Sequence, residues 1–210
     1  MARIPAHFFQ SDDVVGVAKS LIGKLLATKL NGVVTSGMIT ETEAYHESEK
    51  ACHAYNGRRT ERTKVLFEAG GTSYVYLCYG IHYLFNITTG GNGEAAAVLI
   101  RAVQPLIGLP HMLVRRNMEV VNPRVSAGPG MLTKALGITI QQNGISVVNS
   151  KDLWIEPYKN YTAHEIAVSA RVGVAYAQED ARLPWRFILK NNPWVSKTRA
   201  EILKNISISD

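Results

Sequence analysis

The chain has 210 residues, enough for one sizeable domain, and with 46% hydrophobic and 19% charged residues it is not mainly disordered. Its formal net charge of +6 favours a polyanionic partner such as nucleic acid, although many basic proteins bind none. The two cysteines are too few for a disulfide framework and form no CxxC pair, so we expect reduced thiols and no structural zinc site.

The start of the chain lacks the apolar segment of a secretory signal, so we expect a cytoplasmic protein. The longest apolar stretch, residues 75–87, is interrupted by Tyr79, Gly80 and His82. This stretch is too short to cross a bilayer, and we therefore expect no membrane contact.

The first predicted element is a helix that Ser-Asp-Asp at 11–13 can cap and that Gly23 ends, because apolar residues recur between them at spacings of three and four. Two strands follow over 25–30 and 33–41, joined by the Asn31-Gly32 turn, which is a strong hairpin signal.

A polar, irregular stretch is predicted over 46–63. Aromatic and β-branched residues then predict strands over 72–78 and 83–88, around a short turn at Tyr79-Gly80. An apolar strand follows over 95–103.

The C-terminal half is predicted to contain helices over 107–118 and 129–136 and further strands over 168–175 and 186–189. Strands that come from hairpins, without regular βαβ units, indicate an α+β fold with a mostly antiparallel sheet. We find no linker, so we expect a single domain over residues 1–210.

The sequence Glu-Thr-Glu-Ala-Tyr at 41–45 lies at the end of a predicted core strand. Alternation places Glu41, Glu43 and Tyr45 on one face and the residues between them on the other. A carboxylate beside an aromatic ring at a strand end can act as a general base, because partial burial raises its pKa toward neutrality. A solvated surface glutamate is the competing interpretation.

Arg101 is the only charge in the apolar strand over 95–103. A charge there is costly unless a carboxylate or phosphate meets it. Two interpretations stay open: a structural ion pair, or an arginine in a polar pocket that orients a carboxylate or a water.

Three tyrosines, Tyr74, Tyr76 and Tyr79, lie on and beside the predicted hairpin over 72–88. Such rings commonly pack in a core, but an aromatic ring at an exposed apex can enter a base stack in proteins that distort DNA. The basic segment over 56–64 contains threonines and is either a phosphate-binding loop or a solvated face.

Ten ordered segments together resemble the alkyladenine (3-methyladenine) DNA glycosylase family of the mammalian type, as distinct from the helix-hairpin-helix type. The segments are residues 41–45, 51–53, 74–76, 79–80, 86–87, 99–102, 126–129, 171–174, 184–187 and 193–196. The resemblance implies a monofunctional repair hydrolase without a cofactor. Such an enzyme flips alkylated or deaminated purines out of duplex DNA and cleaves the N-glycosidic bond with an activated water, which leaves an abasic site.

By motif position, the resemblance implies that Glu43 is the general base and that Arg101 helps to hold the water. Tyr45, His53 and Tyr76 are then the pocket walls around the flipped base, with the backbone amide of His53 reading its edge. The implied partner is double-stranded DNA that contains damaged purines, bound by a monomer, which would be associated with the nucleoid if its source is prokaryotic.

Further roles follow from the same resemblance. Asn86 is expected to crowd the 2-amino group of guanine, and Tyr79, on a hairpin that enters the minor groove, to take the vacated place in the duplex. Arg58 and Thr60 fall where the family contacts phosphates.

The chain departs from the family pattern at Met131, where a lysine is usual, and we expect Lys134 to supply that phosphate contact. Lys134 also leaves open a bifunctional glycosylase-lyase that forms a Schiff base. A non-catalytic nucleic-acid binder and a small-molecule hydrolase that uses Glu43 and Arg101 stay open as well. A zinc site at His46, Glu47, Cys52 and His53 matches no common ligand spacing.

Overall fold

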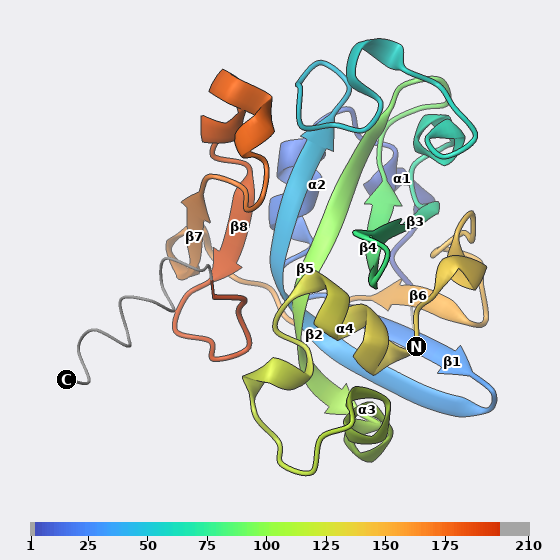
Figure 1. Ribbon diagram of the computed structural model, residues 1–210, viewed down its shortest axis with the longest axis vertical. Coiled ribbons are helices and arrows are strands. Elements are labelled where there is room, and N and C mark those ends of the chain that lie inside the picture. Colours follow the sequence, from blue (N-terminus) through green and yellow to red (C-terminus); the bar gives the residue numbers. More distant parts are fainter. Residues whose placement is uncertain (1–2, 198–210) are drawn as a thin grey trace.

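An antiparallel sheet organises the computed structural model, which describes residues 3–197 (Figure 1). Its eight strands within these residues are β1 (Leu25–Leu30), β2 (Val33–His46), β3 (Ser73–Cys78), β4 (His82–Thr88), β5 (Ala96–Ile107), β6 (Leu153–Glu156), β7 (Ile166–Ser169) and β8 (Arg186–Leu189). The strand order is β3-β4-β5-β2-β1-β6, and β8 pairs with both β2 and β7. The predicted α+β fold is confirmed; residues 1–2 and 198–210 of the predicted domain lie outside the described residues.

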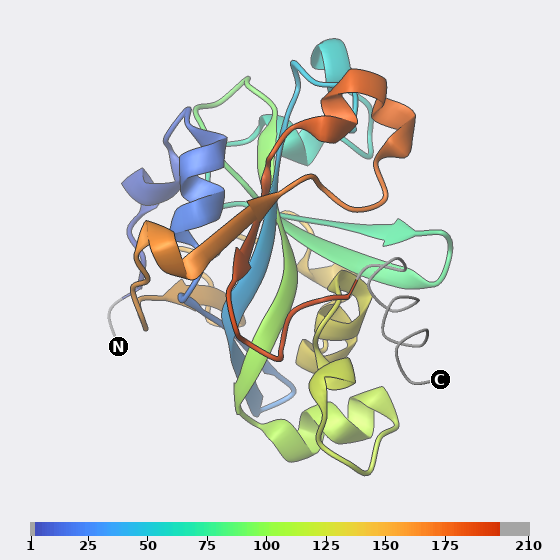
Figure 2. The same cartoon turned by 90° about the vertical axis from the view of Figure 1, so that its left-hand side faces the viewer.

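Short helices cover both faces of the sheet. The α-helices are α1 (Ala6–Phe9), α2 (Val14–Ser20), α3 (Leu109–Arg116) and α4 (Pro129–Leu136), and the 3-10 helices are η1 (Tyr55–Gly57), η2 (Lys64–Phe67), η3 (Pro123–Val125), η4 (Ile140–Gln142), η5 (Ala163–Glu165) and η6 (Ala175–Arg182). Figure 2 shows α2 on one side of β2 and β5, with α4 on the other side. The main core lies between these layers and contains fully buried Leu21, Ile39, Ile100 and Leu132.

β2 is the central strand and its bounds differ from the prediction, which ended it at residue 41. It continues to His46 because β5 pairs along its length, while β1 and then β8 pair with its other edge. These pairings bury the polar segment 41–44 completely. Thr42 donates to the carbonyl of Ala18 in α2, so the opposite face of β2 is left for Glu41, Glu43 and Tyr45 as alternation predicts.

The β3–β4 hairpin projects from the body of the molecule (Figure 2). Its predicted strands and turn are confirmed within one residue at their ends. Tyr79 and Gly80 have φ of 50° and 72°, and the amide of Ile81 donates to the carbonyl of Cys78 at 3.1 Å. Positive φ at both central residues is the geometry that a tight hairpin requires, and glycine adopts it without a steric cost.

Two predicted elements in the second half have different bounds. The helix predicted over 107–118 is shorter, since β5 runs through Ile107 and the left-handed residues Gly108 and Asn117 limit α3 at its two ends. The strand predicted over 168–175 is wrong beyond Ser169, where the chain leaves the sheet.

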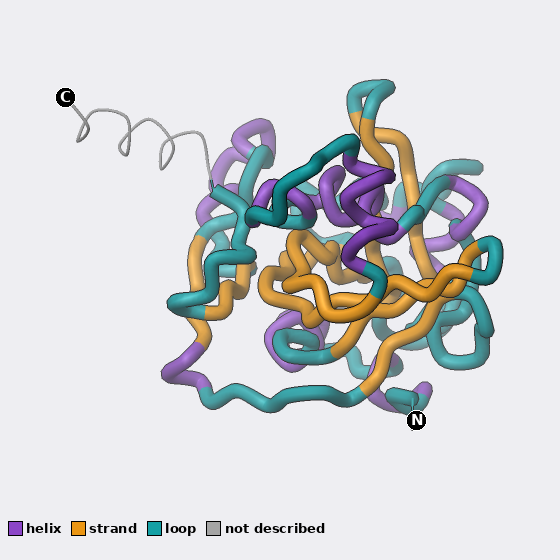
Figure 3. Tube along the Cα trace, turned by 90° about the horizontal axis from the view of Figure 1, so that it is seen from below, coloured by secondary structure: helices purple, strands orange, loops and turns teal. Residues whose placement is uncertain are grey.

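An extended loop over 157–162 joins β6 to η5 and β7 by crossing the molecule (Figure 3). The amide of Lys159 donates to the carbonyl of Gly23 at 2.9 Å and ties the loop to the turn that follows α2. Among the described residues, no helix has the length and apolar character needed to cross a membrane.

Candidate active site

Glu43 extends from β2 toward three hydrogen-bond donors. Its Oε2 accepts from the hydroxyl of Tyr45 at 2.8 Å and from Nη1 of Arg101 at 3.2 Å. Its Oε1 accepts from the backbone amide of Val172 at 2.7 Å. The side chain is fully buried, so these donors replace water around the carboxylate and hold it in one orientation.

Arg101 is buried and its guanidinium contacts three different side chains. Nε donates to Glu41 at 2.7 Å, Nη1 to Glu43, and Nη2 to the hydroxyl of Ser196 at 3.3 Å. Burial by itself lowers the pKa of Arg101, but the two carboxylates outweigh burial and raise it. Arg101 thus forms the buried ion pair that the sequence left open, and it also lines a cavity.

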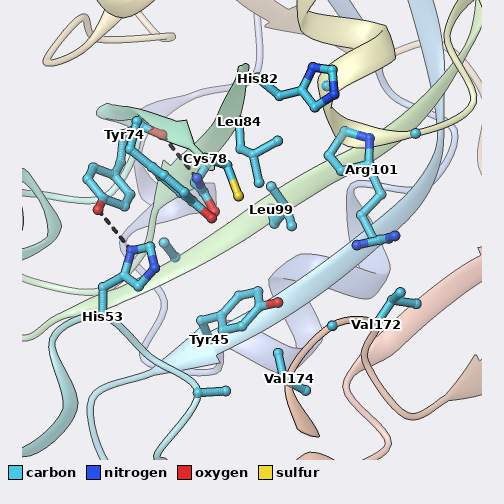
Figure 4. A pocket seen from close by; sticks show the side chains of 18 of the residues that line it. Tyr45, His53, Tyr74, Cys78, His82, Leu84, Leu99, Arg101, Val172 and Val174 are labelled. Atoms are coloured by element: carbon cyan, nitrogen blue, oxygen red, sulfur yellow. Dashed lines mark hydrogen bonds between the residues drawn. The ribbon is translucent and has the colours of Figure 1, made fainter. Parts of the chain in front are cut away.

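A cavity of about 700 Å³ lies beside this cluster (Figure 4). It brings together six of the residues singled out from the sequence: Tyr45, His53, Tyr76, Tyr79, Asn86 and Arg101. Glu43 does not line the cavity, because it lies behind Tyr45, Arg101 and Val172, all of which do. The cavity wall combines apolar and aromatic side chains with polar groups, which include Arg101 beside Glu43 and His53 and Asn86 on the opposite wall.

Aromatic rings from β3 and the loop after β2 form the other side. The rings of His53 and Tyr76 have centroids 4.7 Å apart at 74°, an edge-to-face arrangement. The hydroxyl of Tyr74 lies 3.0 Å from Nδ1 of His53 (Figure 4). Nδ2 of Asn86, on β4, donates to the backbone carbonyl of Tyr74 at 3.1 Å, so Asn86 is held against the same wall.

Three titratable rings of the cavity, those of Tyr45, His53 and Tyr76, are uncharged near neutral pH. Burial, followed by the charge of Arg62, lowers the pKa of His53 to about 4. Burial is also the main reason why the pKa of Tyr45 and that of Tyr76 lie above their usual range. A planar cation that enters the cavity therefore meets neutral aromatic faces, which attract it.

The predicted DNA-contacting residues are exposed, and three of the four lie outside the cavity wall. Tyr79 stands at the apex of the hairpin with 91% of its surface accessible. Arg58 and Thr60 lie in the loop after η1, which Thr63 holds by accepting from the Thr60 amide and donating to the Arg58 carbonyl, each at 2.8 Å. Lys134 is exposed on α4.

Met131 lies at the cavity, with its sulfur 2.7 Å from Nη2 of Arg116. A cationic side chain thus stands beside the position where the family pattern has a lysine. Neither Lys134 nor Arg116 lines the cavity among the described residues.

The sequence did not assign roles to several residues that build the site. Arg171 places its guanidinium 4.7 Å from the ring centroid of Tyr45 and 5.2 Å from that of Trp185. Arg171 also binds both carboxylate oxygens of Glu49, at 2.7 and 2.8 Å. This ion pair fixes the back of the Tyr45 ring. The sequence did contain one signal for Arg171: it is a charged residue in the segment 171–174, which is one of the ten segments that carry the family resemblance.

Within residues 3–197, no group of three or more His, Cys, Asp or Glu side chains is arranged to hold a metal ion. Cys52 and Cys78 are both free thiols. Burial raises the pKa of Cys52 to about 12, so its thiol stays protonated and is a poor metal ligand or nucleophile.

The family model described as methylpurine-DNA glycosylase matches residues 7–193. The chain belongs to the methylpurine-DNA glycosylase family. A relative from Chlamydia pneumoniae is 43% identical over 185 residues, which cover 87% of this chain and 93% of the relative. One from Bacillus cytotoxicus is 40% identical over 205 residues, 93% of this chain and 100% of the relative. Both bear the name "Putative 3-methyladenine DNA glycosylase".

Membership of the methylpurine-DNA glycosylase family makes this protein a DNA glycosylase, a hydrolase of DNA repair. The resemblance drawn from the ten segments is confirmed. A non-catalytic nucleic-acid binder is not favoured, and DNA is the polyanion that the positive net charge indicated.

Proposed function

We propose that the protein excises alkylated or deaminated purines from duplex DNA, acting as a monomer without a cofactor, and leaves an abasic site. The observation that carries this proposal is the position of Glu43. It is a buried carboxylate whose donors Tyr45 and Arg101 form one side of an aromatic cavity next to an exposed hairpin apex.

The proposed chemistry uses Glu43 as the general base. Alkylation at N3 or N7 leaves a purine cationic, so its glycosidic bond is already weak and needs only a water on the far side of the sugar. Glu43 takes the proton of that water, and its charge stabilises the oxocarbenium-like transition state. Nη1 of Arg101 and the backbone amide of Val172 donate to the carboxylate, and both residues line the cavity, which supports a water site beside them next to Glu43.

The proposed base pocket uses Tyr45, His53 and Tyr76 as walls. Stacking on one aromatic ring gives roughly 1–3 kcal/mol to any base. A cationic base gains about 2 kcal/mol more over a desolvated ring, and a normal base does not. Asn86, held by Tyr74, stands against the 2-amino group of guanine and supplies the repulsive element that rejection of a normal base needs.

The proposed DNA contacts come from exposed residues, of which Tyr79 also lines the cavity. Tyr79 enters the duplex as the damaged nucleotide leaves it, because its ring is exposed at the hairpin apex among the described residues and is free to stack on bases. Arg58 and Thr60 contact phosphates from a loop that Thr63 holds in shape, and Lys134 adds a further charge.

Incubation with methylated DNA, and separately with an inosine-containing duplex, tests the proposal. We expect free methylated purines from the first substrate and hypoxanthine from the second, with strands that break only after alkali. Absence of any released base from both substrates overturns the proposal. A covalent adduct trapped by borohydride on the abasic product, and lost in Lys134→Ala, would show instead the lyase activity left open by the sequence.

A further inference from the structure

We infer that Ser196 and Glu41 are positioning residues that hold Arg101 in its working orientation, so that the segment 192–196 completes the active centre. This inference rests on the proposed function. Ser196 lies far from Glu43 in sequence, yet it lines the same cavity as Arg101. The mechanism proposed above uses neither Glu41 nor Ser196.

Glu41 is fully buried and accepts four hydrogen bonds. Oε1 accepts from Nε of Arg101 at 2.7 Å, Nε of Arg186 at 2.8 Å and the Ser196 hydroxyl at 2.8 Å. Oε2 accepts from the backbone amide of Ser196 at 2.7 Å. Glu41 and Glu43 together balance the charges of Arg101 and Arg186, so the cluster has no uncompensated buried charge.

The cluster divides the donors of Arg101 between two carboxylates. A guanidinium and a carboxylate pair most favourably through two parallel hydrogen bonds. Glu41 takes Nε and Ser196 takes Nη2, so only Nη1 reaches Glu43, at the longer distance of 3.2 Å. Arg101 is thereby kept from closing into a two-bond ion pair with Glu43, which would leave the general base less able to accept a proton.

A hydroxyl makes both side-chain contacts of Ser196 because it donates and accepts, whereas a methyl group makes neither. Its oxygen accepts from Nη2 of Arg101 while its hydrogen is donated to Glu41. The backbone around it is anchored separately: the carbonyl of Ser196 accepts from Nη2 of Arg186 at 3.2 Å, and that of Trp194 accepts from the hydroxyl of Thr40. The position of the hydroxyl is therefore set by the segment, independently of Arg101.

The test compares Ser196→Ala with Ser196→Thr, which retains a hydroxyl. Single-turnover excision is measured on a lesion-containing duplex at saturating enzyme, and Kd is measured separately. We expect the alanine variant to lose about tenfold or more in rate, because a displaced Arg101 spoils the geometry of attack. Its Kd should change by less than about twofold, and the threonine variant should recover most of the rate.

A pH–rate profile separates positioning from a merely structural role. In Ser196→Ala, Arg101 is free to pair more closely with Glu43, so we expect the acidic limb of the profile to move to lower pH while the plateau falls. Ser196→Cys weakens both hydrogen bonds at nearly constant size and gives the same comparison should the alanine variant fail to fold.

Wild-type rates and an unchanged pH profile in a folded Ser196 variant overturn the inference. A lowered unfolding temperature with an unchanged rate for the folded enzyme also overturns it, because the role would then be structural alone. If the wild-type protein itself releases no base, the proposed function fails and this inference fails with it. If the wild-type enzyme is active and the Ser196 variants have its rate and pH profile, only the inference is overturned and the proposed function stands.

Discussion

The hydroxyl of Tyr45 lies 2.8 Å from Oε2 of Glu43, and both side chains project from the same face of β2. Residues two apart on a strand are separated by about 7 Å along the backbone. The pleat of one strand thus sets the separation between the proposed general base and a wall of the base pocket. No flexible loop intervenes, which favours a preorganised site.

Replacement of Glu43 by glutamine is expected to abolish excision while DNA binding persists. The amide accepts hydrogen bonds but takes no proton from water, so the single-turnover rate should fall by at least about 100-fold. Binding of lesion-containing DNA, measured by fluorescence anisotropy, should stay near that of the wild type.

Glu156→Gln is the matched control for this change, since Glu156 lies on β6 and contacts Trp154, away from the cavity. Near-normal excision by Glu43→Gln would remove Glu43 from the mechanism.

Loss of the apex ring in Tyr79→Ala should weaken base flipping. The expected loss is larger for a lesion in a well-paired duplex than for one in a mismatch, because a poorly paired base costs less to extrude. A fluorescent base analogue next to the lesion reports the flipped fraction. Tyr158→Ala is the matched control, because it truncates a half-exposed tyrosine of the 157–162 loop. This variant should flip the damaged base as the wild type does. Equal flipping by both variants would contradict the role of Tyr79.

The imidazole of His53 should titrate near pH 4, below its usual 6.5, and NMR of the ring protons measures this directly. The unfolded chain takes up the proton near pH 6.5, whereas the folded protein does not until about pH 4. The stability present above pH 6.5 is therefore lost as pH falls toward 4, by about 2–3 kcal/mol. In His53→Gln this part of the pH dependence of unfolding should be absent.

Arg62 is the second cause of the low pKa of His53. Its Nη2 lies 3.5 Å from Nε2 of that ring, and its guanidinium lies 4.9 Å from the ring centroid of Tyr76. In Arg62→Gln the pKa of His53 should rise but stay below 6.5, because burial remains. A midpoint unchanged from the wild type would show that Arg62 does not act on His53.

Arg58→Ala should weaken DNA binding in a salt-dependent way. Loss of one phosphate contact is expected to reduce the slope of log K against log salt by about 1, similarly for damaged and undamaged DNA. Arg58→Lys keeps the charge and serves as the control with a nearly unchanged slope. An identical slope in all three proteins would place Arg58 off the phosphate backbone.

The sequence predicted the site best where the signal was local. The hairpin apex at Tyr79, the shared face of Glu43 and Tyr45, and the buried charge of Arg101 follow from turn chemistry, alternation and a lone charge in an apolar run. The end of β2 was placed too early because its last residues are polar, and their burial depends on β5 and β8, which come later in the chain.

By itself, then, the sequence determined the fold class and the family, since these depend on short-range patterns and ordered motifs, and it singled out the residues that we propose for the chemistry. The tertiary structure alone decided how Arg101 divides its donors between Glu41, Glu43 and Ser196. Hydrogen bonds between segments separated by up to 155 positions have no periodicity in sequence, because only the folded sheet brings their atoms within reach.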